Sequence, residues 1–329
     1  MQPTQLLMNN DLIYLLFWFS FGLGLIAFAG DGFVKSSVKI AEIFQIPALY
    51  IGTFLIGFST SVPEISVTYL AASKGAIDLS IGNVLGSYIC NIGIVIGITA
   101  LIKPLKVSSE TLEHAIPLLT ISIIITAALL MINNNFSFID GLILLVLFFV
   151  YLVLCYIHIT KNRKRFTRQQ KNSTTTSTTV KALAGFVAFL GLLLLGSELM
   201  VNAARNIAVY LGVDELIIGL TIVAIGTSLP ELTACIIAVM NDEDDIAMGN
   251  IIGSNIFCLL CVLSIPLLLA PPGSISPEKL WIPMVMMLVI TTALWLFSAK
   301  FDKVCQISRI EGGILLSISI FYLIYIGIN

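Results

Sequence analysis

The chain has 329 residues, of which 58% are hydrophobic and only 11% are charged, and its formal net charge is −2. Soluble domains carry roughly 25% charged residues, so this composition excludes a soluble protein. It also indicates many membrane spans rather than a single anchor, and it gives no indication of a nucleic-acid partner.

The first half of the chain contains five apolar runs long enough to cross a bilayer. They are predicted at 12–33, 48–72, 79–102, 115–132 and 138–158. The N-terminal stretch MQPTQLLMNND has no Lys or Arg and therefore lacks the charged region of a signal peptide. We expect the first run to be retained as a span.

A polar interval at 159–181 separates these runs from a second set. It is rich in Lys and Arg and ends in the low-complexity stretch STTTSTTV, a composition typical of a flexible linker. Five further spans are predicted at 182–204, 215–240, 245–270, 280–298 and 310–328. The six cysteines lie mostly within the apolar runs, which favours small core residues over disulfides.

The distribution of positive charge predicts the orientation of the spans. A basic loop belongs on the cytoplasmic side, so the linker is placed there and both termini are placed outside. The outer loops then hold only Lys74, Arg205 and Lys279 of the seventeen Lys and Arg residues. This asymmetry supports ten spans with both ends on the outer side.

Two motifs occur twice, always 167 positions apart. Residues 59–64 read STSVPE and residues 226–231 read GTSLPE, and each is followed by Gly-Asn-x-x-Gly-Ser, beginning at Gly82 and Gly249. Because each half has an odd number of spans, the second half enters the membrane with opposite orientation. We therefore expect an all-α membrane protein of ten transmembrane helices, arranged as two inverted-topology five-helix repeats at 12–158 and 182–328.

Each first motif gathers oxygen ligands in about one helical turn. Thr60, Ser61 and Glu64 share a helix face, and Pro63 deprives the carbonyl of Ser59 of its helical partner. Thr227, Ser228 and Glu231 repeat the arrangement. Hydroxyl, carboxylate and carbonyl oxygens are ligands that Ca²⁺ and Na⁺ prefer. Ions that need the same negative charge would compete for it, and such competition at one site, with access alternating between the two sides of the membrane, is the minimum requirement for exchange.

The second motif places a polar stripe on each following span. Asn83, Ser87 and Asn91 are spaced by four and share one helix face, and the equivalent stripe comprises Asn250, Ser254 and Cys258. The glycines form small-x-x-x-small patterns that allow helices to approach closely. The stripes indicate a second wall of an ion site, although helix packing alone is the alternative.

Together these motifs resemble the alpha repeats of the cation/calcium exchanger superfamily, in its prokaryotic sodium/calcium exchanger-like branch. The resemblance covers nearly the whole chain. It implies an integral protein of the prokaryotic inner membrane, in which the first and sixth spans slide against a core of spans two, three, seven and eight. It also implies the following site residues. Ca²⁺ would bind Glu64, Glu231 and the carbonyls of Thr60 and Thr227; Na⁺ would bind Ser61, Ser87, Ser228, Ser254 and backbone oxygens near Gly57 and Ala224; and Asn91 would complete the centre.

Cys258 departs from the family pattern, because relatives commonly have Asp at this position. Cysteine is a poor ligand for hard cations, so the coupling ion and its stoichiometry stay open. Ser59 and Tyr88 also replace residues usual in the family. The sequence therefore predicts an antiporter that exchanges Ca²⁺ for Na⁺, with no enzyme activity, organic cofactor or obligatory protein partner. An H⁺-coupled or other divalent-cation exchanger, and a non-transporting sensor or scaffold, are the alternatives.

Overall fold

The computed structural model describes residues 3–43, 60–109, 111–133, 137–166, 176–270, 277–299 and 305–328. Nearly all of these residues are helical. The described part holds nine helical segments that are long and apolar enough to cross a membrane. The first part of the predicted span at 48–72, residues 48–59, lies outside the described residues, and so do Gly57 and Ser59 within it.

The first half begins with one long helix and continues with shorter ones. Its helices are α1 (Pro3–Ile43), α4 (Val62–Ser73), α5 (Ile77–Cys90), η2 (Asn91–Ile96), α6 (Gly97–Ile102), η3 (Thr111–Ala115), α7 (Ile116–Asn133) and α8 (Phe138–Phe166). The η segments are π-helical. The segments α5, η2 and α6 run on without a break and together form the third predicted span.

The second half repeats this order. Its helices are α9 (Thr176–Leu211), α10 (Glu215–Ile218), η4 (Gly219–Val223), α11 (Ala224–Thr227), α12 (Leu229–Met240), α13 (Asp244–Phe257), η5 (Cys258–Val262), α14 (Ser264–Leu269), α15 (Pro277–Ser298) and α16 (Arg309–Ile328). Helices α8 and α9 extend into both ends of the interval predicted as a linker at 159–181. The other described spans agree with prediction to within a few residues, apart from α1, which is longer at both ends.

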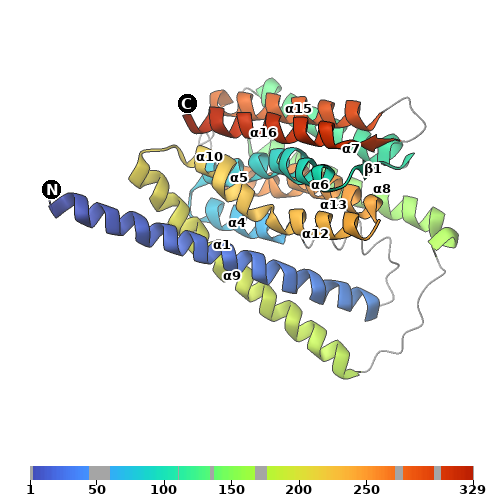
Figure 1. Cartoon of the computed structure of the whole chain (residues 1–329), viewed down its shortest axis with the longest axis horizontal. Coiled ribbons are helices and arrows are strands. Elements are labelled where there is room, and N and C mark those ends of the chain that lie inside the picture. The colour runs from blue at the N-terminus through green and yellow to red at the C-terminus, as the bar shows by residue number, and fades with distance from the viewer. Residues whose placement is uncertain are drawn as a thin grey trace.

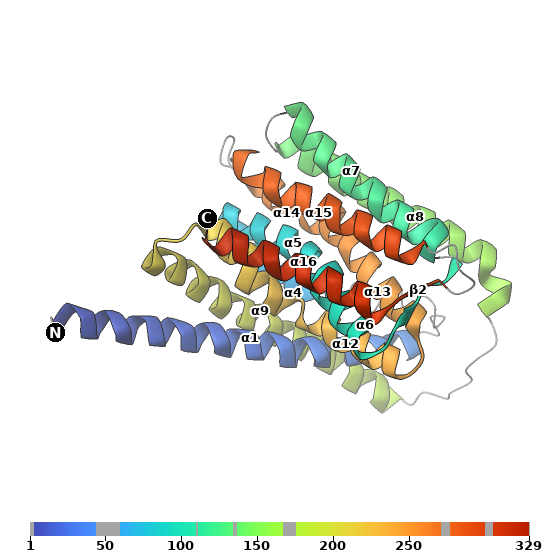
Figure 2. The same cartoon turned by 45° about the horizontal axis from the view of Figure 1, so that its top comes forward.

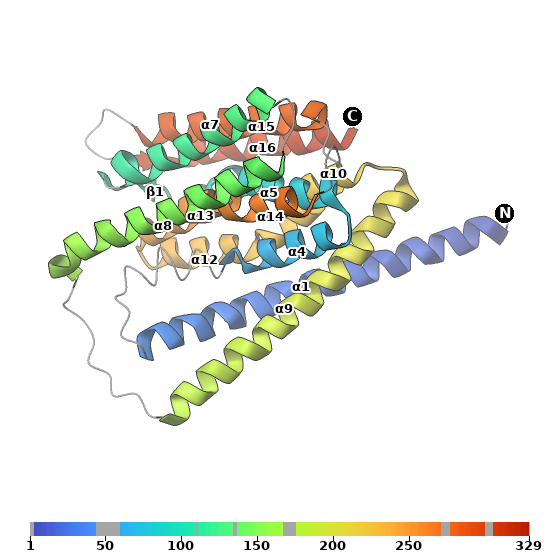
Figure 3. The ribbon, with the colours of Figure 1, turned by 180° about the vertical axis from the view of Figure 1, so that it is seen from behind.

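The helices form three layers (Figure 1). Helices α1 and α9 lie side by side along one flank, and α7, α15 and α16 lie along the opposite flank; α4, α5, α12 and α13 lie between them, as Figure 3 shows from behind. Both chain ends lie toward the same end of the molecule (Figure 2). The flanks expose large apolar side chains such as Phe17 and Phe321, as expected of lipid-facing surfaces.

The third and eighth spans occupy the centre. Buried residues make up 78% of the apolar window in Ile77–Ile102 and in Asp244–Leu269, against 22% in Leu12–Phe33. Glycines allow this close packing: a Cβ on Gly82 of α5 would lie 2.5 Å from the carbonyl oxygen of Leu216. The polar stripes on these two spans are buried as a result: Asn83, Ser87 and Asn91 on one, Asn250 and Ser254 on the other.

A short antiparallel pair of strands, β1 (Leu105–Lys106) and β2 (Gln306–Ile307), was not predicted. It joins the end of the third span to the start of the tenth. Two-residue strands have no detectable alternation, so their pairing leaves no pattern in the sequence.

Candidate ion-binding site

The chain breaks its helical path at the same point in both motifs. Ser61 precedes α4 with φ −84° and ψ 1°, and Ser228 precedes α12 with φ −83° and ψ 3°. A proline follows in the first turn of each helix, where its missing N–H costs no hydrogen bond. The two breaks therefore have one geometry, and each starts a new helix inside the membrane.

Glu64 and Glu231 lie in the first turns of α4 and α12, and neither side chain is exposed. Each carboxylate thus lies near the positive end of a helix dipole. They are close enough for the negative charge of Glu231 to act on Glu64. Within the described residues, none of their four carboxylate oxygens has a hydrogen-bond partner. Two buried carboxyl groups this close can be neutralised by protons or by a bound cation, and only a cation would keep both of them ionised.

Threonines from opposite halves stand beside these carboxylates. Thr227 lies next to Glu64 and Thr60 lies next to Glu231. The Thr60 hydroxyl donates to Asn250 Oδ1 at 3.1 Å, and the Thr227 hydroxyl lies 3.2 Å from Asn83 Oδ1. The two contacts are related by the 167-residue offset, so each half supplies a hydroxyl to the stripe of the other.

The serines of the stripes complete this crossed arrangement. Ser87 Oγ lies 3.2 Å from Thr227 Oγ1, and Ser254 Oγ lies 3.4 Å from Thr60 Oγ1. All four side chains are buried. The structure therefore brings Thr60, Thr227, Ser87 and Ser254 to one place around the carboxylates.

Behind this layer lies a pair of residues that sequence reasoning missed. Asn83 Nδ2 donates to Thr68 Oγ1 at 3.0 Å, and Asn250 Nδ2 donates to Cys235 Sγ at 3.7 Å. Thr68 and Cys235 are again 167 apart, and each lies four residues after its glutamate. The offset and that spacing were the available signal, but the two residue types differ, so no motif repeat marked them.

Asn91 and Cys258 are equivalent positions, and each begins a π-helical segment. Wider π turns are common at functional sites because they re-aim side chains. Asn91 Nδ2 donates to Asn255 Oδ1 at 3.0 Å, while Asn91 Oδ1 is buried without a partner in the described part. Cys258 is fully buried and within range of the charge of both glutamates.

Three other predicted ligands differ in their surroundings. The Ser228 hydroxyl is buried and unpartnered among the described residues, and Ser61 is fully buried. The Ala224 carbonyl already accepts the Ser228 N–H at 3.1 Å and lies 3.3 Å from the Thr227 hydroxyl. Ala224 could therefore bind an ion only through its remaining lone-pair direction or after a local shift.

The described residues hold no group of three or more His, Cys, Asp or Glu side chains that could ligate a metal by themselves. Coordination at Glu64 and Glu231 would need the neutral oxygens around them. Such a mixed oxygen set fits Ca²⁺ and Na⁺ better than zinc or copper.

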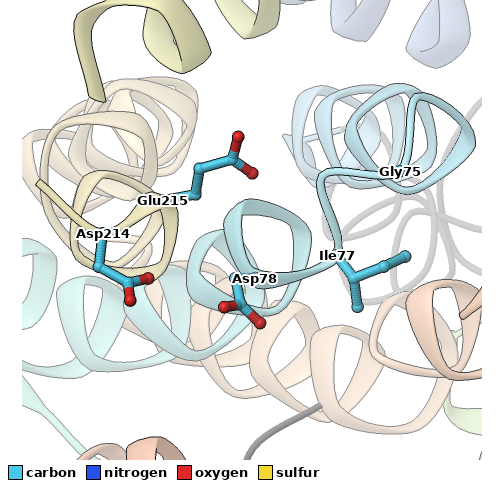
Figure 4. A pocket seen from close by; sticks show the side chains of 5 residues that line it. All are labelled: Gly75, Ile77, Asp78, Asp214 and Glu215. Carbon is cyan, nitrogen blue, oxygen red and sulfur yellow. The ribbon is translucent and has the colours of Figure 1, made fainter. Parts of the chain in front are cut away.

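Acidic side chains gather at one end of the bundle, away from the two glutamates. Figure 4 shows Asp78, Asp214 and Glu215 around a pocket of about 360 Å³ at the starts of α5 and α10. Lys279 of α15 pairs with both aspartates. Partial burial raises the pKa of Asp214, but hydrogen bonds from Lys279 and from the Leu216 N–H outweigh it and hold this pKa below its usual range. The ion pair between Asp214 and Lys279 therefore stays formed at neutral pH and is lost only on strong acidification.

The family model described as sodium/calcium exchanger protein matches residues 14–157 and 181–328. The chain belongs to the sodium/calcium exchanger family. The resemblance seen in the two motifs is thus confirmed. The family is one of membrane ion exchangers, and the apolar helices described above agree with an integral membrane protein.

Individual relatives cover most of this family member. It is 40% identical over 304 residues to the putative antiporter CaxA of Alkalimonas amylolytica, covering 92% of this chain and 95% of the relative. It is 37% identical over 269 residues to the inner membrane protein YrbG of Escherichia coli, covering 78% and 80%. A solved structure of the sodium-calcium exchanger NCX_Mj, soaked with Na⁺ and Sr²⁺, matches with a TM-score of 0.67 and 32% identity, covering 95% of this chain and 98% of that one.

Proposed function

We propose that this protein is a secondary antiporter that exchanges Ca²⁺ for Na⁺ by alternating access at Glu64 and Glu231. One observation carries the proposal: two fully buried carboxylates lie together with no hydrogen-bond partner in the described part of the chain. Hydroxyl and amide groups from both halves surround them. A divalent cation would neutralise both charges at once, and sodium ions would do the same in another arrangement. Ions that share these charges exclude one another, which couples their movements.

The architecture proposed with this function is ten transmembrane helices in two inverted repeats, 12–158 and 182–328, joined by a cytoplasmic linker at 159–181. The crossed Thr–Asn contacts support it, because they relate equivalent residues of the two halves. The charge distribution agrees. Three basic residues predicted outside lie together at one end of the bundle, around α9, α5 and α10: Lys74, Arg205 and Lys279. Two basic residues predicted inside lie elsewhere, Lys103 just after the last turn of the third span and Arg309 in the first turn of the tenth. We place both termini on the outer side of a prokaryotic inner membrane.

Alternating access is proposed to arise from movement of α1 and α9 across the two helix breaks. Helices α1 and α9 pack mainly against each other. Gly30 of α1 faces the breaks: a Cβ there would lie 3.4 Å from Pro230 and 3.9 Å from Pro63. A small residue at this crossing gives a smooth surface that can shift relative to both glutamates. Movement of the helix pair would then open one side of the site at a time.

The test is Ca²⁺ uptake into vesicles that hold the purified protein and an outward Na⁺ gradient. Glu64→Gln or Glu231→Gln keeps the side-chain shape and removes one charge, so we expect uptake to fall by at least about tenfold, since a divalent ion loses half of its compensating charge. Glu278→Gln, at an exposed glutamate, is the matched control and should transport normally. Normal uptake by either site variant would refute the assignment.

An H⁺-coupled exchanger, or one for another divalent cation, is the second candidate. Cys258 favours this candidate, because its thiol beside the carboxylates is neutral. The site therefore has fewer negative charges for binding metal ions than a site with an acidic residue at this position. The same vesicles distinguish the candidates: imposed Na⁺ and pH gradients are compared as driving forces for Ca²⁺ uptake. A non-transporting sensor would take up no Ca²⁺ under either gradient.

A further inference from the structure

Helices α1 and α9 leave a pocket of about 550 Å³ between them, where α1 ends and α9 begins. These two helix ends lie at the same end of the molecule (Figure 3). The volume is within the range of small-molecule sites, roughly 300–1,000 Å³. Neither Glu64 nor Glu231 lines the pocket, so it is separate from the candidate ion site.

Basic side chains line one part of this pocket. Lys35 and Lys39 of α1 follow the apolar segment Leu12–Phe33, and Lys181 lies near the start of α9. All three lysines are exposed. Asp31 also lines the pocket and pairs with Lys35 at 2.6 Å. Because three lysines outnumber one aspartate, the lining favours an anion at the edge of the hydrocarbon layer.

Aromatic rings line the pocket deeper in the membrane. Phe28 lies seven residues before Lys35, and Phe189 lies eight residues after Lys181, which is about 10–12 Å along each helix axis. The two rings meet edge to face, with centroids 5.9 Å apart. Phe28 is 63% exposed on the flank that we assign to lipid. An acyl chain that starts at the lysines would reach these rings, whereas a soluble anion would gain nothing from them.

Small residues keep the two helices in contact along the pocket. A Cβ on Gly32 would collide with the ring of Phe189, and a Cβ on Gly185 would lie 2.9 Å from Ser36 Oγ. The pocket is therefore a crevice whose walls come from both helices. A ligand in it would contact α1 and α9 at once.

We infer that this pocket binds one anionic phospholipid, with its phosphate held by the lysines and an acyl chain against Phe28 and Phe189. In the orientation proposed above, the lipid belongs to the cytoplasmic leaflet, whose negative headgroups attract basic residues near the membrane surface. A lipid that contacts both helices would hold them together as the pair that is proposed to move. That consequence rests on the proposed function, whereas the binding itself does not.

Native mass spectrometry of the purified protein in detergent measures the binding. Phosphatidylglycerol and phosphatidylcholine with the same acyl chains are titrated separately, and we expect one phosphatidylglycerol to bind about tenfold more tightly or better, because only its headgroup is anionic. Glycerol 3-phosphate carries the phosphate without acyl chains and should not displace the bound lipid. Equal binding of the two lipids would overturn the inference. Displacement by glycerol 3-phosphate would identify a site for soluble anions and overturn it as well.

Two variants test the lysines, and a third is their control. Lys39→Gln and Lys181→Gln each remove one positive charge from the pocket, so we expect phosphatidylglycerol to bind about fivefold more weakly to each. Lys106→Gln removes the same charge from an exposed lysine of β1 outside the pocket and should bind the lipid normally. Unchanged binding in both pocket variants, or an equal loss in the control, would refute the site. Ca²⁺ uptake is measured separately, so a failure of lipid binding leaves the proposed function standing.

Discussion

At the scale of single residues, the hydrogen bonds behind Glu64 and Glu231 hold the stripes in place. Asn83 bonds to Thr68 with its amide and lies 3.4 Å from the backbone oxygen of Glu64. Its carbonyl oxygen is then directed to Thr227 of the other half. Thr68 therefore orients the amide that joins the two halves.

Replacing Thr68 by Val tests this positioning. The change keeps the side-chain shape but leaves a buried amide N–H without its acceptor, which costs about 1 kcal/mol or more. We expect the Ca²⁺ concentration for half-maximal uptake to rise by about fivefold or more, with the protein still folded. Ser73→Ala removes an exposed hydroxyl bonded only to its own helix and is the control. An unchanged half-maximal concentration would show that Asn83 needs no such support.

The carboxylates and hydroxyls could be predicted from sequence because they sit in short motifs that repeat at one offset. Their crossed pairing could not, because the way the two halves meet is decided by three-dimensional packing. Thr68 and Cys235 were missed for another reason: the two halves use different residue types to accept the same kind of amide hydrogen.

At the scale of elements, the interruptions within spans position the side chains. Near the prolines of the two motifs the helical path is interrupted for one residue, at Ser61 before α4 and at Ser228 before α12. The π-helical starts at Asn91 and Cys258 were not predictable, since a one-residue shift in backbone hydrogen bonding leaves no mark on apolar periodicity. Because Asn91 and Cys258 are equivalent positions of the two halves, a shared function of the two π-helical segments is supported.

The close packing of α5 on η4 requires a residue without a side chain at position 82, and this requirement can be tested. A Cβ there would lie 2.5 Å from the Leu216 carbonyl oxygen and 3.0 Å from the Leu220 nitrogen, which are backbone atoms that cannot move aside. We expect Gly82→Ala to destabilise the protein by about 1–3 kcal/mol and to lower its unfolding temperature in detergent. Gly191→Ala is the control, because no described atom lies within 4 Å of its new Cβ. Equal unfolding temperatures for the two variants would contradict the packing argument.

At the scale of the whole molecule, polar contacts tie α9 to the central layer at one end. Lys74, in the turn between α4 and α5, pairs with Glu198 at 3.2 Å and with Asn202 at 2.8 Å. Arg205 pairs with Glu215 at 2.9 Å and donates to the Lys74 carbonyl. On α1, Asp31 is equivalent to Glu198 but pairs with Lys35 of its own helix. The described contacts are therefore unequal in the two halves.

Glu198→Gln is expected to loosen α9 at this end. The pair is partly exposed, so the effect should be small, about 0–1 kcal/mol, and weaker at high salt. Hydrogen exchange over 198–211 should become faster, whereas exchange in α15 should not change. Asp31→Asn breaks a pair inside one helix and is the matched control at the equivalent position. Equal acceleration in both variants would show that the contact with Lys74 does not hold α9.

The crossed threonine contacts bear on how such a protein could arise. Because each half finishes the pocket of the other, one half alone would present a carboxylate with its neighbours missing. Two separate copies inserted in opposite directions would already satisfy both sets of contacts, before any gene fusion. The fused chain fixes the ratio of the copies at one to one and leaves each free to diverge, and the different residues at the equivalent positions Asn91 and Cys258 are an example of such divergence.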